Sequence, residues 1–104
     1  MGVNYRACAG MGFKVKIPTL QKQNDDFYFE EYLDNLLDFD KFRYFQDGEE
    51  VYVGSANDYF IVIKNIFPFE SLLEKLNELK KFLLQEDLIE NNQEADLQIG
   101  LEIY

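Results

Sequence analysis

The chain is 104 residues long, 47% hydrophobic and 16% aromatic, and it carries a net charge of −10 at pH 7. That length predicts a single domain spanning residues 1–104, and the apolar content is too high for a wholly disordered acidic tail. The negative charge argues against direct binding to nucleic acid or to an anionic membrane, so the expected partner is a basic protein.

The features that report on location favour the cytoplasm. Cys8 is the only cysteine, so no intramolecular disulfide can form. The start of the chain lacks the basic and then apolar layout of a signal peptide. No apolar run approaches the roughly 20 residues that a membrane-spanning helix needs. We therefore expect a cytoplasmic protein without a membrane segment.

Residues 3–17 alternate between apolar and other side chains without a break, which predicts a half-buried β-strand. Gly10 and Gly12 in its middle indicate a bulge or a bend, or a hairpin, because glycine tolerates the backbone departures that end flat pairing. Pro18 ends the strand. The next periodic segment, residues 26–38, has the spacing of an amphipathic helix, with Asp25 or Asp26 as its N-cap.

The second half of the chain predicts three short strands, a helix and a final strand. The three strands are expected at residues 42–46, 50–54 and 59–64. They are joined by segments 46–49 and 55–58, which are rich in turn formers. A second amphipathic helix begins near Pro68 and continues to about Leu83. Residues 95–103 alternate strictly and predict the last strand.

This order, β-α-β-β-β-α-β, predicts an α+β fold. Two one-sided helices must bury their apolar stripes against one face of a mostly antiparallel sheet, which gives a two-layer sandwich. The long first and last strands are expected near the middle of the sheet. The arrangement is a variant of the ferredoxin-like split βαβ with one additional strand.

The sequence contains little that supports catalysis or metal binding. Histidine is absent, which removes the commonest general base and metal ligand. Cys8 could be exposed and reactive, but an incidental small residue in a strand is favoured. Segment 38–50 resembles an EF-hand loop until its fifth position, Phe42, which offers no oxygen ligand. A looser cation site at Asp47, Glu49 and Glu50 competes with simple solvation. We expect no enzyme activity, cofactor or metal.

Acidic residues are concentrated between residues 25 and 50, which hold ten of the twenty Asp and Glu residues against only Lys41 and Arg43. On a helical wheel, four of these carboxylates share one stripe opposite the apolar side. Like charges spaced four apart each destabilise a helix by roughly 0.2–0.5 kcal/mol. The stripe is either a solvated face or a binding surface. The candidate partner-binding residues are Glu30, Glu31, Asp34, Asp38, Asp40, Asp47, Glu49 and Glu50.

Charge is segregated elsewhere as well. Residues 1–24 hold four basic residues and no acid, whereas residues 86–104 hold six acids and no base. The basic side chains include Arg6, Lys14 and Lys16, which share the parity opposite the expected core. With Tyr52 and Tyr104 they predict an open sheet face that is a candidate surface for a partner or for a second copy in a homodimer.

The predicted protein is small, acidic, free of histidine and of the α+β class. Its acidic features are the stripe at Glu30, Glu31, Asp34 and Asp38 and the turn at Asp47, Glu49 and Glu50. This composition resembles phage-encoded anti-defence inhibitors, including anti-CRISPR and DNA-mimic proteins. The resemblance implies non-catalytic inhibition in the host cytoplasm, with carboxylates occupying the basic groove of a nucleic-acid-binding enzyme.

Two other classes fit the same composition. A toxin-neutralising immunity protein or a general protein-interaction module also presents an acidic surface. A small carboxylate enzyme or an ion-binding domain would need a buried acidic pair or an ordered cation.

Overall fold

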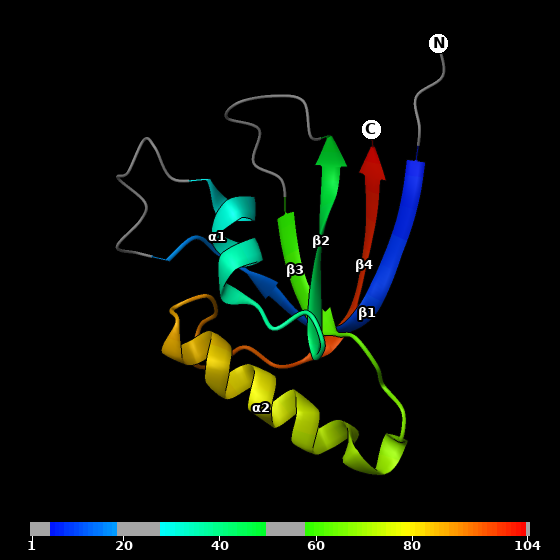
Figure 1. The fold of residues 1–104 in the computed structure, drawn as a ribbon, viewed down its shortest axis with the longest axis vertical. Coiled ribbons are helices and arrows are strands. Elements are labelled where there is room, and N and C mark those ends of the chain that lie inside the picture. Colours follow the sequence, from blue (N-terminus) through cyan, green and yellow to red (C-terminus); the bar gives the residue numbers. More distant parts are fainter. Residues whose placement is uncertain (1–4, 19–27, 50–57, 104) are drawn as a thin grey trace.

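The computed structural model describes residues 5–18, 28–49 and 58–103. Within these segments the chain forms four strands and two α-helices (Figure 1). The strands are β1 (Tyr5–Val15), β2 (Phe42–Glu49), β3 (Asp58–Ile63) and β4 (Asp96–Ile103). The helices are α1 (Phe29–Leu36) and α2 (Leu72–Gln85), and a short 3₁₀ turn, η2 (Phe69–Ser71), precedes α2.

β1 is the strand that joins the two parts of the sheet. Its residues 5–12 pair antiparallel with β4, and its residues 12–15 pair antiparallel with β3. β2 lies antiparallel to β3 on the far side. At its end β2 also meets β4, through a short parallel pairing of residues 48–49 with residues 102–103. The four strands therefore close on themselves in the order β1-β3-β2-β4.

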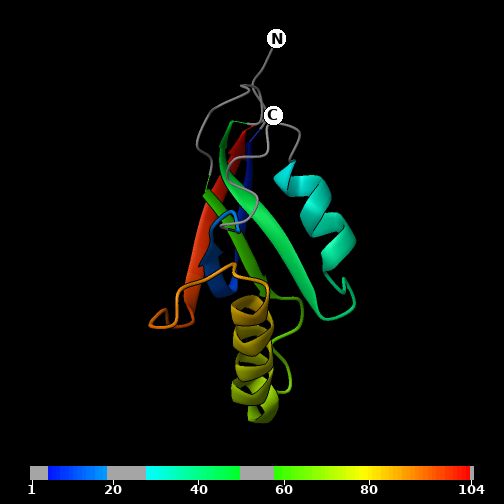
Figure 2. The ribbon, with the colours of Figure 1, turned by 90° about the vertical axis from the view of Figure 1, so that its left-hand side faces the viewer.

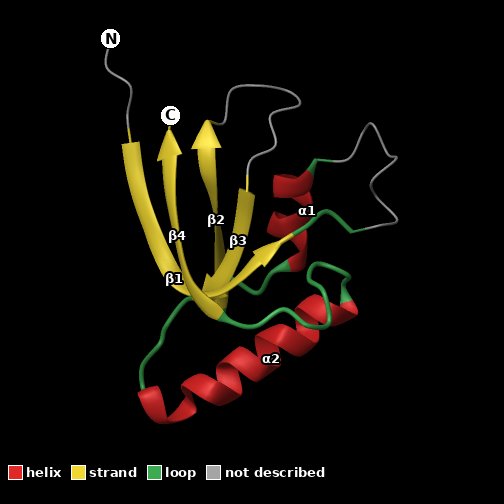
Figure 3. Cartoon of the chain, turned by 180° about the vertical axis from the view of Figure 1, so that it is seen from behind, coloured by secondary structure: helices red, strands yellow, loops and turns green. Residues whose placement is uncertain are grey.

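The closure depends on a close approach of two backbones at Gly12. A Cβ atom at this position would overlap the carbonyl oxygen of Ile61 and would lie 2.6 Å from the Cα of Val62. β1 curves strongly along its length (Figure 3). Its register passes from β4 to β3 without interruption at Gly12. The sequence left a bulge, a bend or a hairpin open at Gly10 and Gly12, and the structure has the bend.

The main core lies between the outer face of the strands and the two helices. Both helices contribute to one continuous cluster, so they cover the same face of the sheet, as predicted. The buried members of this cluster are Phe13, Val15, Leu33, Leu37, Phe42, Ile61, Ile63, Leu79, Leu83, Leu88 and Ile89. A smaller cluster on the other face joins Cys8, Phe45, Phe60 and Val62, so closing the sheet creates a second apolar interior.

The predicted α+β class and the mostly antiparallel sheet are confirmed. The expected place near the middle of the sheet fits β1, which pairs with two strands, but β4 meets its second neighbour, β2, at only two positions. The predicted turn at residues 46–49 is wrong, because these residues continue β2 and its end pairs with β4. The predicted strand at 50–54 lies outside the described residues. The apolar stripe of α2 is only partly covered: Leu79 and Leu83 are buried, but Leu73 is 70% exposed.

We predict that Gly12→Ala destabilises the fold by roughly 3 kcal/mol, because the added methyl group meets backbone atoms that cannot move aside alone. Gly10→Ala should cost about 1 kcal/mol, since its Cβ would meet only the side chain of Val62. Urea unfolding followed by circular dichroism measures both. Equal losses at the two positions would contradict the close approach at Gly12.

We also predict that Leu83→Ala lowers the free energy of unfolding by about 2–5 kcal/mol, because it leaves a cavity in the main core. Leu73→Ala is the matched control in the same helix and should change stability by less than about 0.5 kcal/mol. The same urea titration compares the two variants. A similar loss for both would mean that the exposed half of α2 is packed.

Candidate interaction surface

α1 presents three of the predicted carboxylates and is positioned by its apolar side. Leu33 is fully buried in the main core, and the ring of Phe29 packs edge-on against Tyr59 with centroids 5.0 Å apart. Tyr28 at the N-cap position offers no side-chain cap. The predicted caps, Asp25 and Asp26, lie outside the described residues. Packing rather than capping therefore holds this two-turn helix in place.

The carboxylates that α1 carries are Glu30, Glu31 and Asp34, which we call the acidic α1 surface. Glu31 and Asp34 are exposed and Glu30 is half-buried. Glu30 and Glu31 occupy the first turn, where the helix dipole favours negative charge. This favourable interaction with the helix dipole offsets part of the repulsion between the neighbouring carboxylates of α1.

Asp34 also has a structural role. Its Oδ1 accepts a hydrogen bond of 2.7 Å from the hydroxyl of Tyr44 on β2, so it ties α1 to the sheet. The pKa of Tyr44 is raised well above its usual range, first because the ring is partly buried and then because its proton is held by Asp34. The nearby charge of Glu30 acts in the same direction. One of the three carboxylates on α1 is therefore anchored in a fixed orientation.

Asp38 does not belong to the helical stripe, because α1 ends at Leu36. Its Oδ1 accepts a 3.0 Å hydrogen bond from the backbone N–H of Asp40, and its carbonyl accepts bonds from the N–H groups of Lys41 and Phe42. Asp38 thus shapes the turn that leads into β2. Both Asp38 and Asp40 are exposed beside the end of α1.

Two of the remaining predicted site residues, Asp47 and Glu49, lie in β2 and not in an acidic turn. Asp47 lies in β2, where its Oδ1 accepts a 2.8 Å hydrogen bond from the backbone N–H of Leu101 on β4. The backbone of Glu49 pairs in parallel with Ile103. Glu50 lies outside the described residues. Asp47 therefore contributes to closing the sheet, and the predicted acidic hairpin is replaced by a strand.

Five ion pairs join lysines to carboxylates on β3, on α2 and in segment 87–94. Lys41 contacts Glu78 at 3.1 Å, and Glu78 is also the main reason that the pKa of Lys41 is raised. The other pairs are Lys14 with Asp58, Lys16 with Asp87 and Glu90, and Lys80 with Glu94. Each pair is at least partly exposed, so water and salt screen it and it contributes little to the stability of the fold. These lysines lie outside α1, which itself contains no basic residue.

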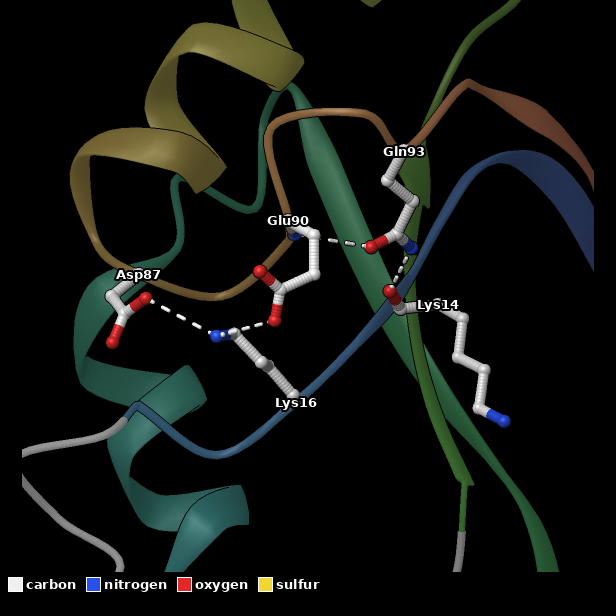
Figure 4. A network of polar contacts seen from close by, with 5 residues as sticks. All are labelled: Lys14, Lys16, Asp87, Glu90 and Gln93. Atoms are coloured by element: carbon white, nitrogen blue, oxygen red, sulfur yellow. Dashed lines mark hydrogen bonds and ion pairs between the residues drawn. The ribbon is translucent and has the colours of Figure 1, made fainter.

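The shortest of these contacts joins the end of β1 to the segment that follows α2 (Figure 4). The Nζ of Lys16 lies 3.3 Å from Asp87 and 2.9 Å from Glu90. The side chain of Gln93 donates to the carbonyl of Lys14 and accepts from the N–H of Glu90. The acidic segment 86–104 is therefore partly neutralised by the basic start of the chain. Although residues 86–104 contain no base, three of their carboxylates have a lysine partner from elsewhere in the chain.

Three other features bear on chemistry. A pocket of about 310 Å³ is lined by Asp40, Lys41, Phe42, Ile63, Asn65, Lys75 and Glu78. Its two ammonium groups are engaged, because Lys41 pairs with Glu78 and Lys75 donates to two backbone carbonyls. Among the residues in the described ranges, no three His, Cys, Asp or Glu side chains cluster as a metal site. Cys8 is buried in the second apolar cluster, so the exposed, reactive interpretation is wrong.

Sequence reasoning missed Tyr44, which anchors Asp34. Tyr44 lies two residues after Phe42 on the core-facing parity of β2, and that parity is the signal that could have found it. Searches of family models, curated proteins and solved structures find no match to this chain. No helix in the described part of the chain is long and apolar enough to cross a membrane.

We predict that stability falls more steeply with rising pH in the wild type than in Tyr44→Phe. The folded state raises the pKa of Tyr44, so above about pH 10 the unfolded chain loses this proton first. The unfolded state then binds fewer protons, and stability declines from about pH 10 toward the folded pKa. Urea titrations between about pH 8 and 11 measure how steeply the free energy of unfolding falls with pH.

Asp34→Asn is the companion variant for this prediction. It keeps an oxygen acceptor for the Tyr44 hydroxyl but removes the negative charge, so its slope should lie between those of the wild type and Tyr44→Phe. If the free energy of unfolding fell equally steeply with pH in all three proteins, the role assigned to Tyr44 would be contradicted.

Proposed function

We propose that this protein is a non-catalytic inhibitor of the anti-CRISPR or anti-restriction type. Its acidic α1 surface docks on the basic groove of a nucleic-acid-binding protein and thereby excludes the nucleic acid. The observation that carries this proposal is the distribution of counter-charge around the molecule.

Lysines pair with Glu78 on α2 and with Asp87, Glu90 and Glu94 in the segment that follows α2. No described ion pair reaches Glu31 or Asp34, and α1 contains no basic residue. After Lys41, the next basic residue that follows α1 in the sequence is Arg43, and its guanidinium donates a hydrogen bond to the backbone carbonyl of Ala9. The carboxylates of α1 therefore create the negative potential that a basic partner would complement.

The mechanism is a general electrostatic fit. Glu30 and Asp34 are four residues apart and so rise by about 6 Å along the helix axis, whereas phosphates on one DNA strand recur every ~3.4 Å. Asp38 would have extended the row, but it lies in the turn after α1. The carboxylates therefore attract arginine and lysine side chains without reproducing a phosphate ladder. Such an attraction accelerates association and is weakened by salt.

We predict that Glu30→Gln/Glu31→Gln weakens capture of the partner by about tenfold, because it removes two charges from the docking surface. The matched control is Glu70→Gln/Glu74→Gln, which removes two first-turn glutamates at the start of η2 and α2 and gives the same net charge. The immobilised proteins are incubated with bacterial lysate at about 50 and about 500 mM salt. Bound proteins are quantified by mass spectrometry.

The expected outcome is a nucleic-acid-binding protein retained at low salt by the wild type and by the control. Equal capture by all three proteins, or capture indifferent to salt, would show that α1 is only a solvated face. Added duplex DNA then tests the inhibitory step. If DNA and this protein bind the captured partner together, groove occupation is wrong and an interaction module or immunity protein is the better description.

A further inference from the structure

The pocket of about 310 Å³ described above lies where the ends of β2 and β3 meet α2. Its apolar lining is the end pair of the β2–β3 ladder, Phe42 with Ile63, and both side chains are buried in the main core. The rest of its lining comes from the turn before β2, the segment after β3 and α2, which lies across this end of the strands (Figure 1). We call this cavity the α2 pocket.

Polar side chains join this part of α2 to the sheet. The Nζ of Lys41 lies 3.1 Å from Glu78, and the Nζ of Lys75 donates to the backbone carbonyls of Asn65 and Phe67 at 3.0 and 2.9 Å. The two buried leucines of α2 lie later in the helix. An apolar helix face would pack directly on the strand ends and fill the space, whereas these lysine bridges span it.

The charges that line the α2 pocket are only half compensated. Lys41 and Glu78 neutralise each other. Lys75 contacts neutral carbonyls, and Asp40 takes part in none of the ion pairs among the described residues. One ammonium, on α2, and one carboxylate, in the turn before β2, therefore line the same cavity without a counter-charge.

These groups also keep hydrogen-bonding capacity. An ammonium has three N–H donors, and Lys75 uses two of them on backbone carbonyls. The Oδ1 of Asn65 accepts from the backbone N–H of Phe67, which leaves the donors of its side-chain amide for another acceptor. Lys75 and Asn65 thus offer donors to an anionic group, and Asp40 offers acceptor oxygens to a cationic one.

The size and charge of the α2 pocket restrict its ligand. Its volume is at the lower end of the range for ligand sites, so a molecule the size of one amino acid fits better than a nucleotide. A ligand with a single charge would leave either Lys75 or Asp40 uncompensated. A zwitterion compensates both, and the apolar lining favours a ligand with an apolar body.

We propose that the α2 pocket binds a free zwitterionic α-amino acid with a large apolar side chain, such as phenylalanine or leucine. Lys75 and Asn65 hold its carboxylate, Asp40 holds its ammonium group, and its side chain lies against Phe42 and Ile63. Because the ligand is small and the pocket is partly open, the dissociation constant should be on the order of 1 mM.

This site goes beyond the proposed inhibition and does not depend on it. α1 lies beside the strands, whereas α2 lies beyond their end (Figure 2). None of the carboxylates of the acidic α1 surface lines the α2 pocket. Lys75→Met should therefore leave capture of a partner from lysate unchanged. Glu30→Gln/Glu31→Gln should leave binding of the amino acid unchanged, so each proposal can fail alone.

Heteronuclear NMR titration of the whole chain with L-phenylalanine, up to about 10 mM, tests the proposal. Amide signals of residues 40–42, 63–65 and 75–78, which belong to the pocket, should shift as the ligand is added. Phenylpropionate lacks the ammonium group and phenethylamine lacks the carboxylate. Phenylalanine should bind about tenfold more tightly than either, since each analogue loses one charge-assisted contact.

Two variants remove the charges that the proposal uses. Asp40→Asn should weaken binding of phenylalanine by about tenfold, to the level of phenylpropionate, because the ammonium group loses its counter-charge. The carboxylate of Asp40 has no ion pair among the described residues, so this variant should fold normally. Lys75→Met should also lose about tenfold. Lys80→Met is its matched control, because Lys80 lies on the same helix and pairs with Glu94 away from the pocket.

The proposal fails if phenylalanine at about 10 mM shifts no signal of the pocket residues. It also fails if phenylpropionate or phenethylamine binds as tightly as phenylalanine, because the two opposite charges would then have no role. Unchanged binding in Asp40→Asn, or an equal loss in Lys75→Met and Lys80→Met, would likewise overturn it.

Discussion

The contact between the backbones of β1 and β3 at Gly12 is the constraint on which the rest of the fold depends. Because no side chain fits there, β1 can leave β4 and join β3 within a few residues. The strands then enclose a small apolar cluster around Phe45 and Val62 and expose their other parity outward. The helices cover one part of that outward side, and the part on β4 carries the exposed side chains of Leu97, Ile99 and Leu101.

The same closure explains how charge is arranged. It brings the end of β1 beside the segment that follows α2, so Lys16 meets Asp87 and Glu90. Lysines elsewhere hold Glu78 and Glu94, whereas α1 is attached to the sheet through apolar contacts and the neutral hydroxyl of Tyr44. The acidic character of α1 is thus a consequence of which contacts secure each element.

Local patterns in the sequence predicted the elements and their class, but long-range contacts decided their limits and their faces. Alternation identified β1 and β4, and helical spacing identified α1 and α2. Residues 46–49 have turn chemistry, yet pairing with β4 draws them into a strand. The acidic stripe was predicted in part: Glu30, Glu31 and Asp34 share α1, while Asp38 and Asp47 have separate hydrogen-bonding roles. The contact of Lys16 with Glu90 has no local signal.

The pairing of β1 with β4 also sets the order in which the fold can form. The side chain of Gln98 donates to the carbonyl of Gly12, and these residues lie 86 positions apart in the chain. Closing so long a loop costs entropy before its contacts are gained, and folds dominated by such contacts form slowly. During synthesis β1 must wait for residues 96–103 to leave the ribosome. Until then the hydrogen-bonding edge of β1 that pairs with β4 lacks its partner strand.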